Sequence, residues 1–93
     1  MPPDVKACVN KFLPNNPVVA NVVLKVLKNA YQTPILPMPM VKQVVERALE
    51  QSRTLDMKVE SAVFEERLSS YANQLRGRYK TELADIRNRG KKW

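Results

Sequence analysis

Proline and glycine, the residues that most often interrupt helices, are unevenly placed along this chain. All seven prolines lie within the first 39 residues, and the two glycines are Gly77 and Gly90. The long stretch from Met40 to Arg76 contains neither, and its apolar residues recur at spacings of three and four, the period of an amphipathic helix. We therefore expect an all-α fold, a small helical bundle of four to five helices in a single domain spanning residues 1–93. The alternative is a set of short N-terminal helices followed by one long helix or helical hairpin.

The first half of the chain carries start and stop signals for two helices. Asp4 is placed to cap a short helix, which Pro14 ends. Asn16 is a favourable N-cap, and Pro17 suits the first position of a second helix that runs to about Gln32. The polar stripe of this second helix is narrow, so we expect the helix to be largely buried.

Residues 33–39, "TPILPMP", form a proline-rich connector between the second and third helices. Three closely spaced prolines hold such a segment extended. We expect it to be a stiff connector that packs Ile35, Leu36 and Met38 on the core. The alternative is a polyproline ligand for an aromatic groove on another protein.

The second half predicts a helix from Met40 to about Gln51, followed by two weak interruptions, "SRT" and "LSS". Thr54 is an expected cap for a further helix whose inward face carries Leu55, Val59, Ala62 and Val63. Ser70 is the expected start of the last helix, with Tyr71, Leu75, Tyr79, Leu83 and Ile86 facing inward. If neither interruption is used, the apolar rhythm continues as one long helix or a hairpin.

Charge and cysteine content limit the compartment and the partners. The net charge is +7 and the sequence pI is about 9.9, which favours phosphate backbones, acidic proteins or anionic lipid. Cys8 is the only cysteine, so the chain has no internal disulfide, and it lies on an apolar stripe as a packing residue. We expect a reducing intracellular compartment, with the nucleus favoured and the mitochondrion as the alternative. No secretory signal and no membrane span are expected.

The sequence carries no recognisable catalytic or metal-binding motif. It has no histidine, no glycine-rich phosphate loop and no paired cysteines. The adjacent carboxylates Glu65 and Glu66 point in different directions on a helix, so we interpret them as part of a solvent-exposed helix face and not as a catalytic pair. We expect a non-enzymatic protein without a cofactor or a metal.

The C-terminal region is the candidate contact surface. The last seven residues, 87–93, form a basic tail that contains four positive charges and ends on the only tryptophan. Arginine and lysine neutralise phosphates, and an aromatic ring can stack on a base. The simpler interpretation is that these cations complement a helix dipole and keep the chain soluble. The candidate nucleic-acid or acidic-partner contacts are Arg76, Arg78, Lys80, Arg87, Arg89, Lys91, Lys92 and Trp93.

Residues 58–85 contain "VESAVFEE" and then "YANQLRGR", followed by Leu83 and Asp85. These blocks resemble the central helical domain of transcription elongation factor IIS, although the loop between them is shorter than in that family. The matching positions in the second block are Tyr71, Asn73, Leu75, Arg76 and Arg78. The resemblance implies a helical domain that contacts the transcription machinery.

A second resemblance spans more of the chain. "VLKNAYQTPILP", "KVESAVF" and the later Tyr71 are similar to segments of KIX domains, the three-helix modules of transcriptional coactivators. This resemblance implies an apolar groove that binds amphipathic activation helices. The residues expected to line such a partner groove are Val26, Tyr31, Tyr71 and Tyr79.

The expected function is therefore a protein–protein interaction module in the transcription machinery that binds partner helices or an acidic surface. One alternative is a small basic structural subunit of a large assembly, such as an organellar ribosome or a respiratory complex. The other is nucleic-acid binding through the basic C-terminal helix and tail. Association of the helices into a homo-oligomer is compatible with all three.

Overall fold

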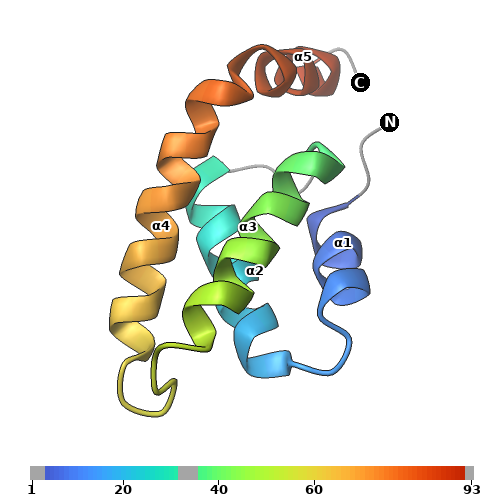
Figure 1. Cartoon of the computed structure of the whole chain (residues 1–93). Helices are drawn as coiled ribbons and strands as arrows, with labels where there is room; N and C mark the ends of the chain where they lie inside the picture. The colour runs from blue at the N-terminus through green and yellow to red at the C-terminus, as the bar shows by residue number, and fades with distance from the viewer. Residues whose placement is uncertain (1–3, 32–35, 92–93) are drawn as a thin grey trace.

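Five helices form the protein in a computed structural model that describes residues 4–31 and 36–91 (Figure 1). The described residues contain no β-strand, so the expected small all-α bundle is confirmed. The helices are α1 (Val5–Phe12), α2 (Pro17–Tyr31), α3 (Met38–Ser52), α4 (Ser61–Arg78) and α5 (Lys80–Lys91).

Helices α2 and α4 lie side by side and run in the same direction, whereas α3 runs antiparallel to both (Figure 1). Their relative direction follows from two contacts. Lys25 pairs with Glu65 at 3.1 Å, and further along both helices the Tyr31 hydroxyl donates to the Ala72 carbonyl. Helix α1 covers α3 and α2, while α5 bends away from the end of α4. The bundle therefore consists of α1 to α4, with α5 as a projecting arm.

The helix starts of the first half follow the expected caps. The Asp4 carboxylate accepts from the Lys6 N–H at 2.9 Å, and the Asn16 side chain accepts from the Val19 N–H at 3.4 Å. Each bond satisfies one of the backbone donors that a helix N-terminus leaves free. Both predicted caps are confirmed.

The connector is shorter than predicted, because α3 begins at Met38 rather than at Met40. Pro37 is the N-cap, and the next proline falls in the first turn, where a missing N–H breaks no helical hydrogen bond. Leu36 is fully buried, as expected, whereas Met38 is partly exposed. Residues 33–35 of the predicted connector, including Ile35, lie outside the described residues.

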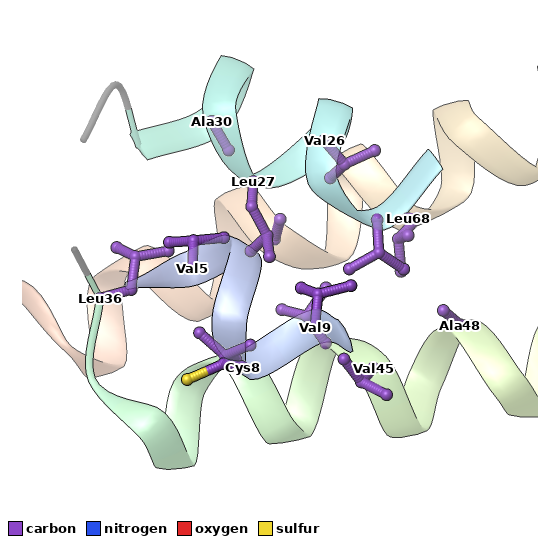
Figure 2. Close-up of a cluster of buried hydrophobic side chains, with 14 of the residues drawn as sticks. Val5, Cys8, Val9, Val26, Leu27, Ala30, Leu36, Val45, Ala48 and Leu68 are labelled. Atoms are coloured by element: carbon purple, nitrogen blue, oxygen red, sulfur yellow. The ribbon is translucent and has the colours of Figure 1, made fainter. Parts of the chain in front are cut away.

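The core is built from valine, leucine and alanine side chains of four helices (Figure 2). In Figure 2, Val9 of α1, Leu27 of α2, Val45 of α3 and Leu68 of α4 converge on one cluster. The buried residues of the described chain include no charged or polar side chain apart from the Tyr31 phenol and the Cys8 thiol. Burial of each large apolar side chain contributes roughly 1.5–3 kcal/mol, so this cluster is the main source of stability.

The prediction of a helix that starts at Thr54 is wrong, since residues 53–60 form turns. The Thr54 hydroxyl donates back to the Gln51 carbonyl, and the Asp56 side chain accepts from the Lys58 N–H at 3.0 Å. Short polar side chains that bond to nearby backbone in this way compete with the helix. The predicted inward face is consequently not formed: Leu55 is half-buried, and the exposed residues are Val59, Ala62 and Val63.

The prediction of a second interruption at "LSS" is also wrong, because these residues lie inside the continuous helix α4. Ser70 does not start a helix. The break falls instead at Tyr79, which closes α4 by donating its N–H to the Leu75 carbonyl at 3.3 Å. The turns at 53–60 and the break at Tyr79 exclude one continuous helix through the second half of the chain.

We predict that Phe64→Ala lowers the free energy of unfolding by about 3–5 kcal/mol, because this fully buried ring leaves a cavity. The neighbouring Val63, 39% exposed, is the matched control, and Val63→Ala should change the same quantity by less than about 0.5 kcal/mol. Urea denaturation followed by circular dichroism measures both. Equal losses would show that α4 presents a different face to the core.

Candidate functional site

The surface where α3 and α4 run antiparallel gathers polar and basic side chains. We call this surface the α3–α4 seam. It contains Gln43, Arg47 and Gln51 of α3, with Arg67, Ser70, Tyr71, Gln74 and Arg78 of α4. The α3 members are four residues apart, and the α4 members follow steps of three and four from Arg67 to Arg78, with Ser70 and Tyr71 adjacent at the second step. Such spacings place side chains in one row on a helix, so two rows face each other.

At one end of the seam, Gln43 links α3 to the end of α4. Its Nε2 donates to the Tyr79 hydroxyl, and its Oε1 accepts from Nη1 of Arg78 at 3.2 Å. The same amide thus holds Tyr79, where α4 ends, and an exposed arginine. This arrangement fixes the direction in which the chain leaves α4 and enters α5.

At the other end, the seam opens into a shallow pocket of about 370 Å³. The pocket is lined by Arg47, Gln51, Arg67, Ser70, Tyr71 and Gln74. The Arg47 guanidinium lies over the Tyr71 ring, 5.4 Å from its centroid, a cation–π contact worth roughly 0.5–1 kcal/mol at an exposed site. The volume is at the lower end of the range for small-ligand pockets.

The pocket is electrostatically positive, because none of its six lining residues is acidic. Arg47 meets Glu50 at 3.9 Å, but both side chains are largely exposed, so this pair contributes little. Within the described residues, Arg67 and Arg78 have no ion-pair partner. The guanidinium groups of the seam are therefore available to an anion from outside.

One acceptor in the pocket is left unsatisfied. Gln51 Oε1 is shielded from solvent and has no hydrogen-bond partner among the described residues. An unpaired buried acceptor costs roughly 1–3 kcal/mol, and such a group calls for an explanation. A donor on a bound molecule would remove this cost once the Gln51 side chain turns its oxygen toward the pocket.

The predicted basic residues do not form one surface. Arg78 belongs to the seam, whereas Arg76 lies on the opposite side of α4, 5.7 Å from the centroid of the Tyr31 ring in α2. Lys80 is exposed at the start of α5. Residues 87–91 of the predicted tail are the last part of helix α5, which ends at Lys91.

The side chains of the remaining predicted contacts, at positions 87, 89 and 91–93, lie outside the described part of the structure. Their placement in a basic surface therefore remains a prediction from the sequence. The backbone shows only that residues 87–91 extend α5.

The predicted partner groove is not formed by its four residues. Val26 is 1% exposed and Tyr31 is 5% exposed, so both belong to the core. Tyr71 and Tyr79 are half-buried and lie along the α3–α4 seam rather than beside the other two. The physical reason is that α4 packs against the apolar face of α2 and covers Val26 and Tyr31.

Sequence reasoning missed Arg47 and Arg67 as site residues, since each reads as an ordinary exposed position on its own helix. A signal was present in the repeat of long polar side chains at four-residue steps from Gln43 to Gln51. The partner row on α4 becomes visible only when the register between the helices is known.

Other chemical groups in the described chain do not build a second site. Burial raises the pKa of the Cys8 thiol, which keeps it in its unreactive protonated form. The described residues contain no group of three metal-ligating side chains. Within these same ranges, no helix combines the length and hydropathy that a bilayer crossing requires.

We predict a pH dependence that originates at Tyr31. Burial raises the pKa of this phenol above its usual value of about 10, against a smaller opposing effect of Arg76. The unfolded chain therefore loses this proton first, and the free energy of unfolding falls as the pH rises above about 10. Tyr31→Phe should cost about 1 kcal/mol at pH ~9 through loss of the bond to Ala72.

Urea denaturation of wild type and Tyr31→Phe at several pH values checks this prediction. The difference in stability between the two proteins should shrink between pH ~9 and pH ~11, because only the wild type has this phenol to ionise. A constant difference would contradict the assignment of the raised pKa to Tyr31.

Comparisons with models of known protein families, with curated proteins and with solved structures find no match to this chain. The resemblances to transcription elongation factor IIS and to KIX domains therefore rest on the quoted sequence blocks alone.

Proposed function

We propose that this chain is a non-enzymatic binding module that contacts nucleic acid through the α3–α4 seam. The observation that carries the proposal is the alignment of Arg47, Arg67 and Arg78 from two helices along one seam whose own residues include no acid, with Glu50 only 3.9 Å from Arg47 at its margin. Amide, hydroxyl and phenol groups stand between these arginines. This mixture of side chains supplies most protein contacts to phosphate, sugar and base edges.

The chemistry of the arginines suits a phosphate backbone. A guanidinium presents several donors in a fixed plane, which matches the oxygens of a phosphate, and it stays charged at any physiological pH. The net charge of +7 adds a long-range attraction that speeds the encounter with a polyanion. Specific contacts in the seam and steering by the whole molecule therefore act in the same direction.

Helix α5 extends the proposed contact surface. It begins next to Tyr79, at the end of the seam where Arg78 lies, and it projects from the bundle (Figure 1). Its first residue is the exposed Lys80, and the sequence from 87 to 93 adds four positive charges without an acid. A backbone bound along the seam would continue toward this arm.

A second candidate function is binding to a partner protein in the transcription machinery, as the two sequence resemblances imply. The observation in its favour is the exposure of three valines, at Val18 (57%), Val59 (79%) and Val63 (39%). These residues lie near the starts of α2 and α4, away from the Gln43 end of the seam. Isolated exposed apolar residues are common on soluble proteins, so the seam supports the nucleic-acid proposal more strongly.

We predict that Arg67→Gln and Arg78→Gln each weaken binding to a fluorescent DNA or RNA strand of about 20 nucleotides by about 5-fold, as loss of one phosphate contact requires. Fluorescence anisotropy between about 50 and about 200 mM salt should also show the slope of log K against log salt falling by about 0.7 per lost contact.

Arg76→Gln is the matched control, because it removes the same charge from the opposite side of α4. It should change affinity by less than about 2-fold. Equal weakening by all three variants would show that net charge alone drives binding. Absence of salt-dependent binding to any strand or duplex would refute the proposed function.

A further inference from the structure

We propose that the pocket between Arg47 and Arg67 holds one unpaired nucleotide of a single-stranded nucleic acid. The inference rests on the proposed function and assigns a role to a single pocket within the seam. Three features of this pocket carry it: two guanidinium groups, a cation–π contact between an arginine and an aromatic ring, and an amide oxygen without a donor.

The phosphate of the nucleotide is assigned to the two arginines. Arg47 comes from α3 and Arg67 from α4, so the pocket has a cation on each side. Ser70 supplies a hydroxyl from the same α4 row as Arg67. A phosphate between two such side chains accepts charge-assisted hydrogen bonds from both walls.

The base is assigned to the exposed face of Arg47. The guanidinium carbon lies 5.4 Å from the centroid of the Tyr71 ring, while 45% of the side chain remains accessible to solvent. Unstacked bases lie on arginine planes as well as on aromatic rings in single-strand complexes. Tyr71 holds the guanidinium in place, so that Arg47 acts as an already oriented stacking platform.

The edge of the base is assigned to the two amides. Gln74 places an exposed amide at the pocket, and the shielded Gln51 Oε1, which lacks a donor, meets the base when its side chain turns toward the pocket. Nucleobases carry N–H donors next to acceptors, and glutamine side chains pair with such edges. A bare phosphate has no donor at neutral pH, so the unsatisfied oxygen favours a ligand that includes the base.

The shape of the pocket favours a single strand over a duplex. Base edges in a duplex lie at the bottom of its grooves and are reached by a protruding helix or ribbon. This pocket is instead a hollow between two helices, which receives a base only when that base is turned out of the stack. An unpaired strand presents its bases in this way.

The test compares fluorescent strands of about 12 nucleotides in anisotropy titrations. We expect oligo(dA) or oligo(A) to bind at least about 5-fold more tightly than an abasic strand with the same number of phosphates, and more tightly than the matching duplex. Whichever of the two oligoadenylate strands, DNA or RNA, binds more tightly identifies the sugar.

Two variants in the pocket and one outside it locate the effect. Gln51→Ala should remove most of the preference for the strand with bases over the abasic strand, and Gln74→Ala, at an exposed position, should reduce it without a risk to folding. Asn29→Ala removes an exposed amide from α2 and should leave the preference unchanged.

The possible results separate this inference from the proposed function. Equal affinity for the abasic strand, or for the duplex, would overturn the nucleotide pocket while salt-dependent binding of the seam to phosphates still stood. A phosphopeptide that bound at Gln51 and Ser70 in an NMR titration, with no shift there on addition of oligoadenylate, would also overturn it. Failure of every strand and duplex to bind would remove the proposed function itself.

Discussion

The contact between α2 and α4 is the one on which the rest of the structure depends. Phe64, Leu68, Ala72 and Leu75 form the buried row of α4, and this row packs against the apolar face of α2. Because α2 is apolar over most of its surface, it is stable only when it is covered. The Tyr31 hydroxyl then bonds to the Ala72 carbonyl and fixes the register between the two helices.

The α3–α4 seam is a consequence of that register. Once α4 turns its apolar row toward α2, the residues beside that row face α3, and these include Arg67, Tyr71 and Arg78. The same rotation places Arg76 on the α2 side. The packing that stabilises the core therefore also decides which arginines stand together, so that stability and the proposed function share one geometric cause.

Local signals in the sequence were sufficient to predict where α1 and α2 begin. Asp4 and Asn16 act as caps, and prolines end or begin helices where their geometry requires it. The second half was harder, because Thr54 and Ser70 are polar residues that suit a cap, a turn or a helix surface. The bond from the Thr54 hydroxyl to the Gln51 carbonyl and the bond from the Lys58 N–H to Asp56 explain the turns at 53–60. Tertiary packing of the buried row of α4 explains why the helix continues through Ser70.

The site was less predictable than the fold for a related reason. A row of polar residues on one helix is chemically uninformative, since nearly every exposed helix face has one. A candidate site can be recognised only where two such rows face each other, as Arg47 and Gln51 of α3 face Arg67 and Gln74 of α4. That meeting depends on a register set by buried side chains elsewhere. The unpaired oxygen of Gln51 marks the place where packing leaves a hydrogen-bonding requirement unmet, and a polar ligand is a physical means of meeting it.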